Sequence, residues 1–110
     1  MSNRLSVLVL VLVVAGLVAA PAFSAGKAET GKVLYDKKCV ACHAKDGTGN
    51  PGMAKMLKVE MKALGSKEVQ AKSDADLKKE IVEGTGKMKA VKLTDDEAAD
   101  VIAFVRTLKK

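Results

Sequence analysis

The residues best suited to chemistry lie within five positions of one another. The segment 37–50, KKCVACHAKDGTGN, contains both cysteines and the only histidine of the 110-residue chain. Cysteines at i and i+3 share one face of a helical turn, so the thiols of Cys39 and Cys42 can bond to one edge of the same flat group. His43 follows directly and is placed to ligate a metal at the centre of that group.

This C-x-x-C-H pattern is typical of a c-type haem attachment site. In that interpretation, Cys39 and Cys42 form thioethers with the two vinyl groups of the porphyrin, and His43 is the proximal iron ligand. A zinc site needs four ligands where this chain offers three, and a thioredoxin-like C-x-x-C expects a βαβ context. A disulfide would leave His43 unexplained. The sequence therefore favours one covalent haem c with its iron.

The second axial ligand cannot be a histidine of this chain, which leaves methionine, lysine, a small molecule or none. Met53, Met56 and Met61 lie at helical spacing among leucines, which favours apolar packing against the haem. Met88 lies 45 residues after His43 in a glycine-bearing loop, which lets the chain approach the iron from its other side. We expect Met88 to be the distal ligand; the alternative is an exposed loop methionine between two lysines.

Residues 1–25 have the three-part pattern of a secretory signal peptide. A lone cation, Arg4, precedes an uncharged run over residues 5–20, and PAFSA follows with the small residues that signal peptidase requires. Cleavage after one of residues 22–25 would leave a domain of residues 26–110 in the periplasm. The alternative is a retained N-terminal anchor, because the segment approaches the roughly 20 residues of a membrane span.

The composition of the remaining chain favours a large apolar cofactor. Cleavage would remove Arg4 and lower the formal charge from +6 to +5, and it would leave only Tyr35 and Phe104 as aromatic residues. A domain this small and aromatic-poor usually needs a staple beyond its own core. Nucleic-acid binding is disfavoured, because export removes the target and no aromatic stacking platform is present.

Hydrophobic periodicity and capping residues predict an all-α domain of three to four short helices and no strand. Helices are expected over residues 26–42, 53–64, 73–83 and 94–108, with loops over 45–52 and 84–92. Ser73 is the expected N-cap of the third helix and Gly84 its C-terminal stop. Thr94 and Glu97 form a capping box, and the inner face of the last helix comprises Ala98, Val101, Ile102, Val105 and Leu108.

Three stretches resemble class I c-type cytochromes of the small bacterial monohaem type: GKVLYDKKCVACHAKDGTGN (31–50), LKKEIVEGTGKM (77–88) and LTDDEAADVIAFVRTLKK (93–110). The resemblance covers residues 26–110. It implies the cytochrome c fold, in which the N- and C-terminal helices cross around one covalent haem, with Gly31, Tyr35 and Phe104 at the crossing. It also implies His43 and Met88 as iron ligands and the carbonyl of Pro51 as acceptor for the imidazole N–H.

The distal loop departs from the family pattern. Lys89 stands where a proline commonly follows the methionine, Val91 replaces an aromatic residue, and the loop is shorter. These differences predict a less rigid loop, from which a lysine displaces Met88 at high pH.

A haem iron with both axial positions filled by protein has no open position for a substrate, so we expect a one-electron carrier and not an enzyme. Lysines flank both halves of the site and predict a positive rim around it. This rim is expected to steer acidic redox proteins, the electron donor and acceptor, to the site. We expect the protein to be a monomer. If Met88 does not ligate, the alternative is a gas-binding sensor or weak peroxidase; if the signal is retained, it is a membrane-tethered electron-transfer subunit. The rim lysines are Lys37, Lys38, Lys45, Lys87 and Lys89.

Overall fold

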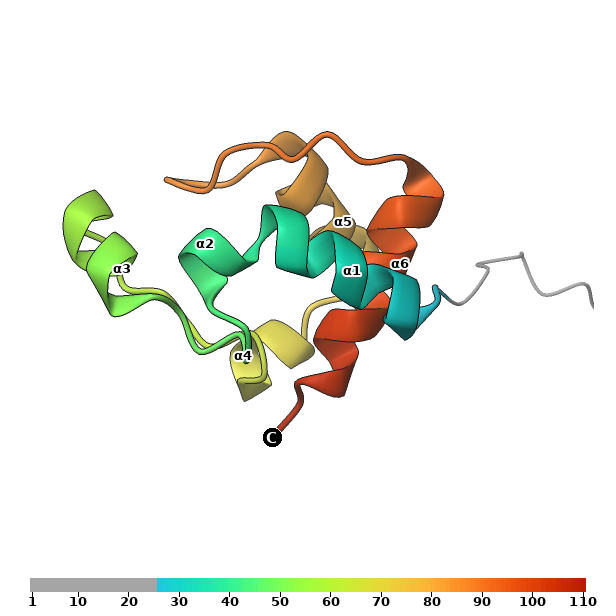
Figure 1. The fold of residues 1–110 in the computed structure, drawn as a ribbon, viewed down its shortest axis with the longest axis horizontal. Helices are drawn as coiled ribbons and strands as arrows, with labels where there is room; N and C mark the ends of the chain where they lie inside the picture. The colour runs from blue at the N-terminus through green and yellow to red at the C-terminus, as the bar shows by residue number, and fades with distance from the viewer. Residues whose placement is uncertain (1–25) are drawn as a thin grey trace, which may run out of the picture.

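A computed structural model describes residues 26–110, and the predicted signal segment lies outside this range. The described chain is helical without any strand, as expected (Figure 1). Four helices have seven or more residues and two are single turns of four residues. In chain order they are α1 (Ala28–Lys38), α2 (Val40–His43), α3 (Pro51–Leu57), α4 (Lys67–Gln70), α5 (Asp74–Glu83) and α6 (Asp95–Thr107).

The contact of α1 with α6 is the central packing interaction, and the two helices lie against each other in Figure 1. A Cβ atom on Gly31 would lie 1.8 Å from the carbonyl oxygen of Asp100, so only glycine allows this approach. One turn later, the fully buried ring of Tyr35 packs on Phe104, with ring centroids 4.9 Å apart and tilted by 53°. The expected helix crossing and its three contact residues are therefore confirmed.

The helix termini follow the local signals in the sequence. Thr94 and Glu97 form a complete capping box at the start of α6. Ser73 accepts a hydrogen bond from the backbone N–H of Asp76 at the start of α5, and Gly84 ends that helix with φ of 81°. On α6 the predicted inner face is buried except for the half-buried Leu108, and it packs with Val69 and Leu77.

The first predicted helix is divided at Cys39. The first helix, α1, begins at Ala28. The backbone of Cys39 has φ of −118° and ψ of −28°, which departs from the α-helical values near −63° and −42°. Because of this break, the attachment motif forms a separate turn, α2, rather than continuing the axis of α1. The single helix predicted over residues 26–42 was therefore wrong in its middle and at its first two residues.

The second predicted helix, 53–64, was wrong at both ends. Asn50 accepts hydrogen bonds from Gly52 N–H and Met53 N–H, and Pro51 occupies the first helical position, so α3 begins two residues early. Lys58 adopts a left-handed conformation with φ of 55° and ends α3. Residues 58–63 are non-helical, and the four-residue α4, capped by Ser66, is too short to leave a periodic signal.

Side-chain hydrogen bonds connect the segment around α4 to the last helix, α6. Arg106 donates to the carbonyl oxygens of Gln70 and Lys72 and to the carboxylate of Asp74 at 2.9, 2.7 and 2.7 Å. The Gln70 amide donates in turn to the carbonyl oxygens of Leu64 and Val105. Among residues 26–110, no helix is long and apolar enough to cross a membrane.

We expect Gly31→Ala to destabilise the protein by about 1–3 kcal/mol or more, since the added methyl group must push α1 away from α6. Chemical denaturation of the haem-loaded protein measures this change. Thr30→Ala adds no atom at the contact and lies on the exposed side of the same helix, so its effect should stay within about 0.5 kcal/mol. Equal stability of the two variants would contradict the close packing of α1 on α6.

Candidate functional site

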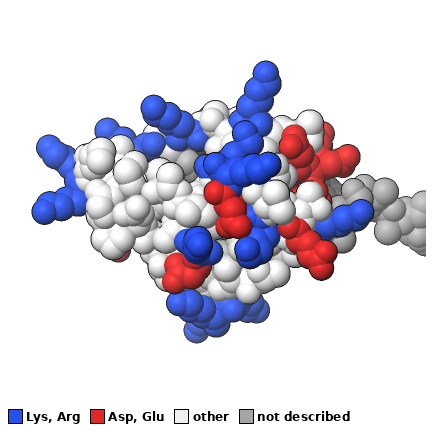
Figure 2. All heavy atoms as spheres, viewed as in Figure 1, with Lys and Arg blue, Asp and Glu red and all other residues white. Residues whose placement is uncertain are grey.

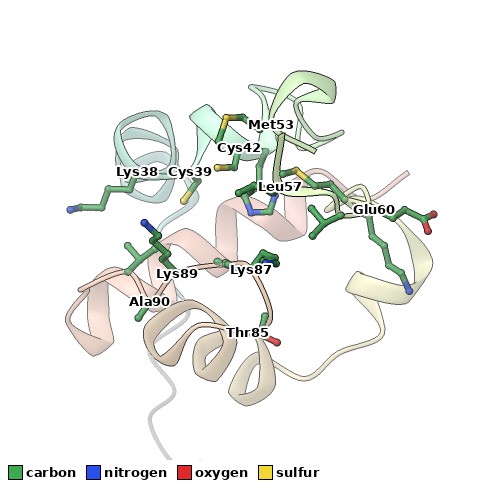
Figure 3. Close-up of a pocket in the computed structure, with 16 residues that line it drawn as sticks. Lys38, Cys39, Cys42, Met53, Leu57, Glu60, Thr85, Lys87, Lys89 and Ala90 are labelled. Atoms are coloured by element: carbon green, nitrogen blue, oxygen red, sulfur yellow. The ribbon is translucent and has the colours of Figure 1, made fainter. Parts of the chain in front are cut away.

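A cavity of about 570 Å³ lies beside the C-x-x-C-H turn (Figure 3). Its walls come from the end of α1, α2, α3, the segment 59–62 and the loop 85–91. This volume falls in the range of roughly 300–1,000 Å³ that is usual for cofactor sites. A second cavity of about 180 Å³ lies against the apolar core of α5 and α6. We call the first cavity the outer cavity and the second the inner cavity. Cys39, His43, Lys62 and Met88 line both cavities.

The two thiols are positioned by one turn of chain. The backbone N–H of His43 donates to the carbonyl of Cys39 at 2.9 Å, and the N–H of Cys42 donates to the same oxygen at 3.3 Å. Cys39 and Cys42 are half-buried and do not form a disulfide with each other. Burial raises the pKa of the Cys39 thiol. Both sulfurs therefore line the outer cavity without a bond that would withhold them from a ligand.

Residues on both sides of His43 hold its backbone. Asn50 donates from its backbone N–H to the carbonyl of Cys42 at 2.8 Å and from its side chain to the carbonyl of Ala41 at 3.2 Å. Ala44 has a positive φ of 63°, and the hydroxyl of Tyr35 donates to its carbonyl at 2.5 Å. The same burial raises the pKa of Tyr35 to about 12, so the phenol stays protonated and remains a donor.

The imidazole of His43 is suited to bind a metal. Burial lowers its pKa, which favours the neutral form that ligates metals. Its Nδ1 atom is buried without a hydrogen-bond partner in residues 26–110. The predicted hydrogen bond from the imidazole N–H of His43 to the carbonyl of Pro51 is therefore not formed in this structure. Pro51 is the first residue of α3, and its carbonyl points along the helix axis toward the next turn.

These features fit a covalently bound haem. The cavity is large and mainly apolar, two thiols line it, and a neutral imidazole with an unpaired buried nitrogen stands beside them. Within the described residues, no cluster of three or more His, Cys, Asp or Glu side chains is arranged to hold a metal by itself.

Met88 faces the same cavities from a defined turn. Thr85 and Met88 exchange both of their backbone hydrogen bonds, at 3.0 and 2.8 Å, and Gly86 has the positive φ of a tight hairpin turn. The N–H of Val91 donates to the carbonyl of Ile81 at 2.8 Å and closes the loop onto α5. Backbone hydrogen bonds therefore connect this loop within itself and to the end of α5.

The remaining methionines divide into two groups. Met53 and Met61 line the outer cavity, as expected for residues that pack against a cofactor. Met56 has 71% of its surface exposed, so the expectation that it packs there was wrong. Within α3 the side chains that line the cavity are Met53 and Leu57, one turn apart on one face, and Met56 lies outside that face.

Three of the five rim lysines line the outer cavity: Lys38, Lys87 and Lys89. They come from the end of α1 and from the loop that carries Met88, and Figure 3 shows Lys38 and Lys89 on the same side of the pocket. Lys37 and Lys45 do not line it. In Figure 2, Lys and Arg side chains are spread over the viewed face.

Sequence reasoning missed two residues of the site. Asn50 joins the attachment turn to α3, and an Asn-Pro pair at a helix start was a usable capping signal. Lys62 lines both cavities, but it lies in a segment predicted to be helical and is one of many lysines, so no local signal distinguished it.

An all-α domain that gathers two thiols, a neutral imidazole and a thioether around an apolar cavity defines a protein of the covalent-haem class. The chain belongs to the cytochrome c family, since the family model described as Cytochrome c matches residues 28–109. It is similar to a solved structure, the KustC0563 c-type cytochrome, with 32% identity, coverage of 73% of this chain and 98% of that one, and a TM-score of 0.62. No curated protein sequence matches it.

Family membership carries two statements about this chain. It is a small c-type cytochrome with covalently bound haem c and its iron, and its fold is the cytochrome c fold. The family is one of haem-based electron carriers.

Gly84→Ala should weaken the distal half of the site. The added Cβ would lie 2.7 Å from the carbonyl oxygen of Met88, at a φ of 81° that L-residues rarely adopt. Strain and overpacking together should cost about 2–5 kcal/mol, with loss of the weak far-red band that reports methionine ligation in the ferric protein. Gly86→Ala, whose Cβ meets nothing within 4 Å, should cost only about 1–2 kcal/mol and keep the band. Retention of the band in both variants would argue against Gly84 as the support of Met88.

Proposed function

We propose that this protein is a monohaem c-type cytochrome that carries single electrons between redox proteins of the periplasm. The observation that carries the proposal is that His43 and Met88, one from each half of the chain, line the same two cavities. With both residues ligating, no iron position stays open to a substrate. A carrier role follows, and an enzymatic role does not.

Each residue of the site has a separate role in this proposal. Cys39 and Cys42 form the thioether bonds, His43 is the proximal ligand and Met88 the distal ligand. Bound haem supplies a one-electron Fe(III)/Fe(II) couple. The thioether of Met88 favours the reduced state and raises the reduction potential. The apolar side chains of the inner cavity exclude water from the ring; they include Leu64, Val69, Leu77, Ile81, Val101, Ile102 and Val105.

Lysines at the outer cavity support acidic proteins as donor and acceptor. Lys38, Lys87 and Lys89 are exposed, and all three stand where a bound haem would come closest to a partner. A positive surface at this point raises the local concentration of acidic partners and aligns them with the site. Exposed charges of this kind act mainly on association rates and are screened by salt.

The cellular setting rests on residues 1–25, whose pattern favours export followed by cleavage. We propose a periplasmic monomer. The mass of the purified protein tests cleavage: a form beginning near residue 26 supports it, whereas the full 110-residue mass supports a membrane-tethered electron-transfer subunit instead.

Met88→Ala separates a carrier from a gas-binding sensor or peroxidase. The parent protein, expressed with haem attachment, should show the haemochrome spectrum and the far-red band, and its reduced form should bind carbon monoxide slowly or not at all. Met88→Ala should lose the far-red band and bind carbon monoxide at least tenfold faster, because the iron position is open. Met53→Ala, which changes a methionine of the same cavity, should behave like the parent. Equally fast binding by parent and Met88→Ala would overturn the carrier proposal in favour of the gas-binding alternative.

Charge reversal of Lys38, Lys87 and Lys89 to glutamate should slow reduction by an acidic ferredoxin by about 10–100-fold at low ionic strength, because steering is lost. Stopped-flow mixing measures the second-order rate, and the difference should shrink as salt is added. The matched control makes the same change in charge away from the cavity, at Lys37, Lys45 and Lys109. Equal slowing of the two triple variants would show that net charge, and not the three lysines that line the cavity, controls encounter.

A further inference from the structure

The inner cavity is mostly apolar, and besides Tyr35, Cys39 and the neutral His43 its lining includes three charged residues, Lys62, Lys72 and Glu80. Lys72 and Glu80 form an ion pair at 2.6 Å, and both of them line the cavity, so together they present no net charge to it. Lys62 pairs with Glu68, which lines neither cavity. Lys62 therefore supplies the net positive charge of the inner cavity.

The place of Lys62 relative to the haem-binding residues is informative. It is one of only four residues that line both cavities, and the others are Cys39, His43 and Met88. A flat group held by those three residues would occupy space that Lys62 also lines. The segment that carries Lys62 is fixed at its end, because the N–H of Leu64 donates to the carbonyl of Gly47 at 2.9 Å.

Lys62 also belongs to the side of the pocket away from the rim lysines. In Figure 3, Glu60 marks the segment 59–62, and it lies across the pocket from Lys38 and Lys89. Glu60 itself lines only the outer cavity. The cysteine sulfurs, by contrast, belong to the wall formed by α1 and α2.

The chemistry of haem supplies the ligand for this cation. Haem carries two propionate carboxylates on the ring edge opposite the vinyl edge that a C-x-x-C motif anchors. A carboxylate at the mouth of an apolar cavity needs a cation or hydrogen-bond donors to remain ionised. We propose that Lys62 binds one of these carboxylates, an assignment that rests on the proposed haem-binding function of the site.

The existing partner of Lys62 does not prevent this role. The Lys62 and Glu68 side chains are 60% and 65% exposed, and ion pairs in water are weak because solvent and salt screen them. A haem carboxylate held beside Lys62 by covalent attachment of the ring has a high effective concentration and competes with the exposed Glu68. Lys62 then neutralises charge near the iron and favours the reduced state.

The reduction potential of the haem-loaded protein tests the assignment. Lys62→Gln should lower the equilibrium constant for reduction about three- to tenfold, where tenfold corresponds to about 59 mV for one electron. Lys62→Arg should restore it to within twofold of the parent. Lys67→Gln makes the same change in charge at an exposed residue that lines neither cavity, and its effect should remain below twofold.

A pH profile separates carboxylate binding from a general charge effect. Without Lys62, the pKa of the haem carboxylate rises, so the carboxylate takes up a proton as the pH falls. The reduction potential of Lys62→Gln should therefore increase as the pH falls from 8 to 5. The parent and Lys67→Gln should lack this step. The other titratable groups that act on Lys62 or share a cavity with it are Tyr35, Lys38, Cys39, Cys42, His43, Glu60, Glu68, Lys72, Glu80, Lys87 and Lys89, and the carboxylates among them are Glu60, Glu68 and Glu80. Replacing each of the three glutamates by glutamine in the Lys62→Gln background should leave the step in place.

The outcomes distinguish this proposal from the proposed function. If Lys62→Gln matches Lys67→Gln in potential and pH profile while covalent haem and the far-red band persist, the assignment of Lys62 is overturned and the carrier proposal stands. A larger shift in Lys72→Gln than in Lys62→Gln would overturn it as well. If Lys62→Gln does not fold, Glu68→Gln decides: freeing Lys62 should raise the equilibrium constant by more than Glu83→Gln does. A parent protein without covalent haem would overturn the proposed function itself.

Discussion

The backbone approach of α1 to α6 at Gly31 is the constraint on which the site depends. It brings Tyr35 against Phe104 in the core. The phenol ring thus has two connected roles: its ring packs at the helix crossing, while its hydroxyl holds the carbonyl of Ala44, the residue after His43. A shift of α1 would therefore reach the backbone next to His43, the proposed proximal ligand, through a single side chain. The two aromatic residues of the described chain, Tyr35 and Phe104, thus both lie at this crossing.

The two halves of the site are built by different means. The proximal half is local in sequence, because Cys39, Cys42 and His43 share one turn that Asn50 ties to α3. The distal half depends on where α5 ends: Gly84 stops the helix, and the hydrogen-bonded pair Thr85–Met88 turns the chain toward the cavity. Only packing of α5 on α6 brings the second half opposite the first.

Features that depend on residues near one another in the sequence were largely predictable, and features that depend on packing of distant segments were not. Caps at Ser73 and Thr94 and the contact at Gly31 were predictable, because few residue types satisfy those positions. The extent of α3 was not, since methionines and leucines that line a cofactor cavity from a non-helical segment can have the same spacing as a helix face. Cys39 and His43 were recognisable from their motif. The position of Lys62 depends on three segments packed together, and no short stretch of sequence encodes that.

The core of the described chain shows why haem attachment and folding belong together. Eight hydrophobic residues are buried, and most belong to α6. The apolar residues on the opposite walls of the cavities, such as Leu57, Met61 and Ile81, are only half-buried. A flat apolar ring in this space would cover those side chains from both faces and remove their surface from water, which stabilises the folded state in proportion to the area covered. Because thioether bonds would keep such a ring in place in both oxidation states, the contacts that complete the core would also hold His43 and Met88, the proposed axial ligands, at fixed positions, which would limit the reorganisation that electron transfer requires.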